Sequence, residues 1–253
     1  MPTARNGDVR LRYRSIGEGG AGTVAFVPDA GCGAWQWAWQ APALAGRRTS
    51  LVYYPRGTGP SDAPPGPYDV ATLARDLDAV LAADGSEPTT VVGAGFGGLV
   101  ALAHARQSGR AARLVLLGTG ATGERFTTDP LFAGPASLDG LLGAEFLSDR
   151  PADRERIEDW RRKEDATGEA ADAYRAAIES ADLGDHLVEV TAPTLVLHGD
   201  ADPVVPVAAG RSLAEALPRG EFEPVRDGHH WFFIERSRAV SDRIDGVLPE
   251  TND

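Results

Sequence analysis

Several residue types that define functional classes are scarce in this chain of 253 residues. Cys32 is the single cysteine, which excludes an internal disulfide and a cysteine-based zinc cluster. No run of about 18 apolar residues occurs, and residues 1–9 have no apolar core of the signal-peptide type. We therefore expect a cytoplasmic protein with neither a membrane helix nor a secretory leader. Nothing in the spacing of its potential ligands indicates a metal or another cofactor.

Basic residues are also under-represented, with 25 Lys and Arg against 37 Asp and Glu, a formal net charge of -12. Such a charge argues against nucleic acid or an anionic membrane as a partner and leaves a small molecule as the expected one. The hydrophobic content of 42% and the length suit one large globular domain. Abundant Ala, Gly, Arg and Pro are typical of a GC-rich bacterial genome. The oligomeric state is left open.

What the chain does contain is a regular alternation of strand and helix patterns. Residues 8–16 alternate polar and apolar side chains, as an antiparallel edge strand does. Short apolar runs predict further strands at 23–27, 49–54, 89–94, 113–117, 194–198 and 221–226, and helical spacing is found at 41–45, 70–83, 207–217 and 234–247. Alternation of this kind predicts a mostly parallel sheet flanked by helices.

Residues 119–190 interrupt this alternation. No strand pattern is evident there, and charged helical stretches dominate at 153–163 and 169–180. The sequence therefore predicts a core formed by residues 1–118 and 191–253, with residues 119–190 inserted as a small helical cap.

The stretch 89–104 has two possible interpretations, because it combines a short strand, a glycine-rich turn and an alanine-rich helix. Gly93, Gly95 and Gly98 match the G-x-G-x-x-G phosphate turn, whereas Gly93, Gly95 and Gly97 match a G-x-S-x-G nucleophile elbow with glycine in place of serine. A dinucleotide turn should follow the first strand and be succeeded by a carboxylate at the end of the next. No carboxylate occurs there before Glu124, which disfavours the nucleotide interpretation.

Three distant segments support the elbow. Residues 56–61 read R-G-T-G-P-S, residues 198–203 read H-G-D-A-D-P, and residues 227–230 read D-G-H-H. With the elbow they resemble the α/β-hydrolase superfamily, which has the chain order elbow, acid, histidine. The resemblance implies an eight-stranded, mostly parallel sheet flanked by helices with a small helical cap. It also implies that Asp202 is the triad acid and His229 the triad histidine.

Two departures from this family pattern, Gly95 at the elbow and Asp29 in the oxyanion loop, change the expected chemistry. Gly95 stands at the nucleophile position, so neither an acyl-serine nor an aspartate nucleophile at this position is available. The remaining His229–Asp202 dyad is predicted to act as a general base, on substrate or on a water beside Gly95. Backbone amides of Phe96 and Ala30 are expected to form an oxyanion hole. Asp29 beside that hole must point away, be protonated, or mark a hole that no longer stabilises an anion.

Other candidates for the pocket are Cys32, Thr119, Trp160 and His230. Cys32 is expected to be a small buried wall residue rather than a substitute nucleophile, and His230 a packing or wall residue. The leading hypothesis is a small-molecule enzyme that performs elimination, cyclisation, ring opening or direct water attack. Lyases and cyclases of this superfamily, many in secondary metabolism, suggest that range. Two alternatives stay open, namely a non-catalytic binding protein and a serine hydrolase whose nucleophile was replaced.

Overall fold

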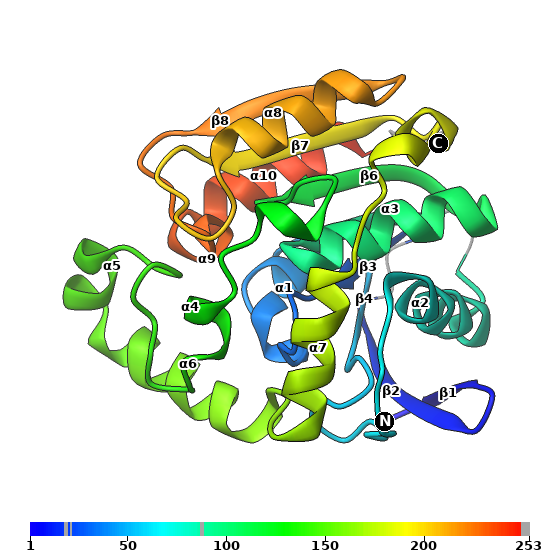
Figure 1. Cartoon of the computed structure of the whole chain (residues 1–253), viewed down its shortest axis with the longest axis horizontal. Coiled ribbons are helices and arrows are strands. Elements are labelled where there is room, and N and C mark those ends of the chain that lie inside the picture. The colour runs from blue at the N-terminus through cyan, green and yellow to red at the C-terminus, as the bar shows by residue number, and fades with distance from the viewer. Residues whose placement is uncertain (18–19, 21, 87–88, 249–253) are drawn as a thin grey trace.

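The computed structural model, which describes residues 1–17, 20, 22–86 and 89–248, contains one eight-stranded sheet (Figure 1). Its strands lie in the order β1-β2-β4-β3-β5-β6-β7-β8. The first two pairings, β1 with β2 and β2 with β4, are antiparallel, and the others are parallel. The strands are β1 (Thr3–Asn6), β2 (Val9–Ile16), β3 (Thr23–Val27), β4 (Thr49–Tyr53), β5 (Thr89–Ala94), β6 (Ala111–Leu117), β7 (Thr194–Gly199) and β8 (Gly220–Val225). The predicted α/β-hydrolase architecture is confirmed.

Helices cover both faces of this sheet (Figure 1). They include α1 (Gln40–Leu44), α2 (Val70–Asp84), α3 (Phe96–Ser108), α8 (Val207–Ala216), α9 (Phe232–Glu235) and α10 (Ser237–Val247), with a 3-10 turn η1 (Ala34–Trp37). Helix α2 packs beside α3, and α1 packs beside α10. Because both faces are covered, β5 and β7 are buried throughout, which explains their continuous apolar runs.

Two local predictions needed correction. The strand β1 was not anticipated, and the closing helix predicted at 234–247 is divided into α9 and α10 at Arg236, whose φ of -110° and ψ of 36° are not helical.

Between β6 and β7 the chain forms only helical elements and loops, apart from isolated bridges. These elements are η2 (Gly123–Arg125), α4 (Asp129–Phe132), α5 (Ala144–Asp149), α6 (Pro151–Glu164), α7 (Glu169–Glu179) and η3 (Gly184–Glu189). The loop between α6 and α7 lies against the loop that follows β3, where Ala166 N donates to Gly31 O at 2.8 Å. The helical segment therefore packs directly on the loop that contains Asp29. No helix among the described residues is long and apolar enough to cross a bilayer.

Candidate active site

Gly95 lies at the apex of a sharp turn between β5 and α3. Its φ of 50° and ψ of -122° are unfavourable for residues with a side chain and natural for glycine. Neighbouring glycines permit the tight approach, since a Cβ on Gly93 would lie 2.5 Å from Gly97 O, and one on Gly97 would lie 2.5 Å from Val27 O. The strand, turn and helix thus have the shape of a nucleophile elbow without a nucleophile on it.

The space above Gly95 is filled by the side chain of Asp29, which reaches it from the loop after β3. A Cβ built on Gly95 would lie 2.6 Å from Asp29 Oδ2 and closer still to Oδ1 and Cγ. The Asp29 side chain is almost completely buried, at 1% exposure for the residue. The expectation that water or substrate occupies this space is therefore wrong, because a carboxylate of the chain itself occupies it.

One oxygen of Asp29 lies in the predicted oxyanion hole. Asp29 Oδ1 accepts hydrogen bonds from Phe96 N at 2.9 Å and from Ala30 N at 2.8 Å. These are the two amides predicted from the sequence to form the hole, and they do converge on one point. Asp29 therefore does not point away from the hole: its own carboxyl oxygen occupies the hole, which is closed to an anion from a substrate.

The other oxygen of Asp29 faces a histidine. Asp29 Oδ2 lies 2.9 Å from His230 Nε2 and 3.2 Å from Trp231 Nε1. His230 Nδ1 lies 2.8 Å from Asp202 Oδ2, and Asp202 Oδ1 accepts from the backbone N–H groups of Val204 and Val205. Asp29, His230 and Asp202 thus form one continuous carboxylate–imidazole–carboxylate array, which we call the Asp29 array.

Both ring nitrogens of His230 face carboxylate oxygens, so both can donate only if the ring is an imidazolium. Burial alone would lower the pKa of His230, but the charges of Asp202 and Asp29 outweigh it and raise the pKa to about 10. Burial likewise opposes ionisation of Asp202, yet the charge of His230 and hydrogen bonds with His198 and His230 hold the pKa of that carboxyl well below its usual range. His230 is therefore charged at neutral pH.

The prediction that His229 pairs with Asp202 is wrong, because the structure places His230 there. His229 turns to Glu235 instead: its backbone N donates to Glu235 Oε2 at 3.2 Å, and its Nδ1 lies 3.3 Å from Glu235 Oε1. Its side chain is 32% exposed, whereas His230 is 1% exposed. Likewise, the expectation of a packing role for His230 is corrected. Of the two adjacent histidines only His229 directly follows the glycine of a Gly-His pattern, so the local motif points to His229 whereas the fold places His230 beside Asp202.

The remaining predicted pocket residues lie around the Asp29 array without joining it. Cys32 is buried, and its pKa is raised by burial and by the charges of Asp165 and Asp29, which keeps it a thiol. Thr119 is buried against the elbow helix, where a Cβ on Gly98 would lie 2.7 Å from its Cγ2. Trp160 stacks on Trp35 with ring centroids 6.3 Å apart. These contacts assign all three to packing.

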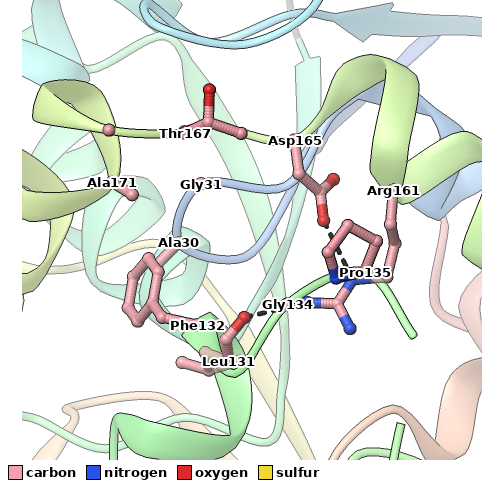
Figure 2. A pocket seen from close by; sticks show the side chains of 12 residues that line it. Ala30, Gly31, Leu131, Phe132, Gly134, Pro135, Arg161, Asp165, Thr167 and Ala171 are labelled. Carbon is pink, nitrogen blue, oxygen red and sulfur yellow. Dashed lines mark hydrogen bonds and ion pairs between the residues drawn. The ribbon is translucent and has the colours of Figure 1, made fainter. Parts of the chain in front are cut away.

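A cavity of about 240 Å³ lies between the loop after β3 and the helical segment (Figure 2). Ala30 and Gly31 form its wall on the side of the Asp29 array. The opposite walls come from the region of α4 and from the end of α6 with the start of α7, and they include Arg161 and Asp165. Sequence reasoning missed these two residues, because a charged i, i+4 pair on a charged helix resembles an exposed face.

The charge of His230 can be measured directly. Nitrogen-15 NMR of the imidazole is expected to show a protonated ring at pH 8, where an unperturbed histidine with a pKa of 6.5 is neutral. In Asp29→Asn one of the two opposing carboxylates becomes neutral, so the titration should move to lower pH. A ring that is already neutral at pH 8 in the unmodified protein would contradict the imidazolium assignment.

The comparisons with known proteins agree with this fold. Residues 24–243 match the model of the alpha/beta hydrolase family. The chain belongs to this family. Among the relatives of this alpha/beta hydrolase is 3-oxoadipate enol-lactonase 2 of Acinetobacter baylyi, 25% identical over 97% of this chain and 95% of the relative. Another is a 2-hydroxy-6-oxononadienedioate/2-hydroxy-6-oxononatrienedioate hydrolase of Cupriavidus pinatubonensis, 28% identical over 97% and 93%.

Solved structures of the family superpose over nearly the whole chain. The enol-lactonase from Burkholderia xenovorans LB400 is 28% identical, with a TM-score of 0.86 over 98% of this chain and 100% of that one. Such relatives are enzymes that act on small molecules, which supports an enzyme here. Among the described residues, no group of three or more His, Cys, Asp and Glu side chains is arranged to hold a metal ion.

Proposed function

We propose that this alpha/beta hydrolase is a small-molecule enzyme that works without a serine nucleophile and transfers protons through the Asp29 array. The observation that carries the proposal is the position of Asp29, whose carboxylate fills the volume of a nucleophile at residue 95 and lies 2.9 Å from His230 Nε2. The reacting group is thus supplied by the loop after β3 instead of by the elbow. The dyad predicted from sequence is replaced by a three-residue array.

The roles of the three residues follow from their hydrogen bonds. Every polar neighbour of Asp29 that its side chain contacts is a donor: Ala30 N, Phe96 N, His230 Nε2 and Trp231 Nε1. Asp29 is therefore assigned as an acceptor and as the general base of the proposal, and His230 as the matching acid. The bond from Trp231 is the longest of the four at 3.2 Å, so we assign it as the one that substrate or water displaces.

This arrangement supports elimination, ring opening, ring closure and direct attack by water. In each of these reactions Asp29 Oδ2 takes a proton from a C–H or O–H group. His230 returns a proton to the oxygen that gains charge, and Asp202 keeps the imidazole oriented. Acyl transfer is disfavoured, because the two amides that would stabilise its oxyanion already bind Asp29 Oδ1. The relatives named as enol-lactonase and oxo-acid hydrolase support a small carbonyl compound as substrate.

A non-catalytic binding protein is the second candidate, favoured by one observation: all four donors around Asp29 are engaged and the carboxylate is buried. A serine hydrolase with a replaced nucleophile fits less well. Its serine would occupy the volume that Asp29 fills, so the change would have required rearrangement of a second loop.

Proton exchange into small carbonyl compounds tests the proposal without knowledge of the natural substrate. We expect the protein to accelerate loss of the α-proton signals of cyclohexanone and γ-valerolactone in D₂O, followed by proton NMR. Asp29→Asn should slow this exchange by roughly 10²–10⁴, the usual contribution of a general base. His229→Gln, which lies outside the array, is the matched control and should retain the rate. Equal accelerated rates for Asp29→Asn and the unmodified protein would contradict Asp29 as the base, and no exchange by the unmodified protein would favour the binding protein.

A further inference from the structure

The cavity beside the Asp29 array is bounded by the residue next to Asp29 in the chain. Ala30, whose N–H donates to Asp29 Oδ1, forms its wall together with Gly31, and Leu131 and Phe132 of α4 face them (Figure 2). An apolar cavity of about 150 Å³ is known to hold benzene. A cavity of about 240 Å³ therefore has room for a single ring with a small substituent.

The two charged side chains in its wall are fully engaged with the protein (Figure 2). Arg161 donates through Nε to Asp165 at 3.0 Å, through Nη1 to Ser137 O at 2.7 Å and through Nη2 to Leu131 O at 2.9 Å. Asp165 accepts in addition from Trp35 Nε1 at 2.6 Å and from Gly33 N at 3.2 Å. The pair is neutral as a whole, so the cavity offers a ligand no unpaired positive charge.

The nearest charges outside this pair favour neutral ligands further. The Asp29 array sets two carboxyl groups around one imidazole, so its cationic group is already paired on both sides and is not available to a ligand. Burial together with the charges of Asp165 and Asp29 raises the pKa of Cys32, as expected where the local potential is negative. A ligand carboxylate in the cavity would be desolvated there without a compensating partner.

We infer that the cavity takes an uncharged ligand of about one ring and rejects carboxylates. This inference rests on the proposed function, since it names the substrate class of the same site. The inferred ligand class also differs from the one that the relatives' names indicate. Those names contain 3-oxoadipate and nonadienedioate, which are carboxylates. The cavity prefers uncharged ligands to carboxylates because the Arg161–Asp165 pair in its wall is neutral as a whole.

Benzamide and benzoate form a matched pair of probes, because they have the same shape and differ by one charge at pH 7.5. Saturation-transfer NMR and titration should show benzamide binding in roughly the millimolar range, with benzoate weaker by about tenfold or more. Ala171→Trp, on the cavity side of α7, should remove benzamide binding. Ala176→Trp, on the exposed side of the same helix, should not. Benzoate binding as tightly as benzamide, or benzamide binding unchanged by Ala171→Trp, would overturn the inference.

Asp165→Asn tests the charge argument itself. It keeps the shape of the side chain and leaves the Arg161 charge uncompensated, so benzoate should gain about tenfold in affinity relative to benzamide. An unchanged preference would show that the pair does not set the selection. Binding is read separately from turnover: Asp29→Asn should bind benzamide while losing proton exchange. If benzamide binds selectively but the unmodified protein exchanges no protons, the proposed function fails and the inferred ligand class stands. If the protein exchanges protons but does not prefer benzamide to benzoate, the proposed function stands and the inferred ligand class fails.

Discussion

Gly95→Ser alone is expected to create no serine-hydrolase activity. The new Cβ would lie 2.6 Å from Asp29 Oδ2 and closer still to the rest of that carboxylate, so the side chain has no space. Even if the Asp29 side chain moved aside, its Oδ1 would compete for hydrogen bonds from the amides of Phe96 and Ala30, which an acyl intermediate needs. The variant is therefore expected to hydrolyse p-nitrophenyl acetate no faster than the unmodified protein.

The double variant Asp29→Gly with Gly95→Ser is expected to gain strong esterase activity. Removal of the carboxylate frees both amides and the volume above residue 95, while His230 keeps its 2.8 Å contact with Asp202. Loss of one of its two opposing carboxylates lowers the pKa of His230, so the ring can act as a base toward the new serine. We expect a gain of about 10³ over either single variant, the order by which a triad exceeds its parts.

Stopped-flow release of p-nitrophenol distinguishes the outcomes. The double variant should show a burst that matches the enzyme concentration, because an acyl-enzyme accumulates when deacylation is slower than acylation. Asp29→Gly alone is the matched control, with an open hole and no nucleophile. A burst in Gly95→Ser alone would show that Asp29 does not block the elbow, and absence of any gain in the double variant would show that the site is built for other chemistry throughout.

The fold could be predicted from sequence because its strands are buried on both faces and its turns are marked by glycine. The strand β5 (Thr89–Ala94) is buried throughout and is followed directly by the glycines of the elbow. The strand β1 (Thr3–Asn6) was missed, since four residues with one buried side chain show no pattern outside their pairing with β2. Short edge strands depend on tertiary partners more than on their own residues.

The site was predictable only in part, because side-chain directions depend on partners far away in the chain. Asp202, Gly95 and the amides of Phe96 and Ala30 were identified from local motifs. His229 and His230 are chemically identical, and what separates them is Glu235 of α9, which holds the loop and also accepts from Gly143 of the helical segment. That Asp29 fills the space over Gly95, a residue 66 positions away, is a property of the packed loops alone.

Stability measurements distinguish the two histidines without a substrate. His230→Gln leaves the carboxylates of Asp29 and Asp202 buried without the cation between them, and loss of one partner of a buried charge pair costs about 3–5 kcal/mol. His229→Gln removes only a 3.3 Å contact of a partly exposed ring with Glu235, and exposed pairs contribute about 0–1 kcal/mol. Urea unfolding at pH 7 should therefore show a large loss for the first variant and a small one for the second.

The pH dependence of the free energy of unfolding also distinguishes the two histidine variants. In the unmodified protein the pKa of His230 is raised from 6.5 to about 10, so its contribution to stability is complete below pH 6.5 and is lost as the pH rises toward 10. The pKa of Asp202 is lowered from 3.8, so its contribution is present above that value and is lost as the pH falls below it. In His230→Gln the contribution of the raised His230 pKa is absent, so the loss of stability that the unmodified protein shows as the pH rises from 6.5 toward 10 should be absent too. If His229→Gln behaves in this way instead, the histidine of the array has been misassigned.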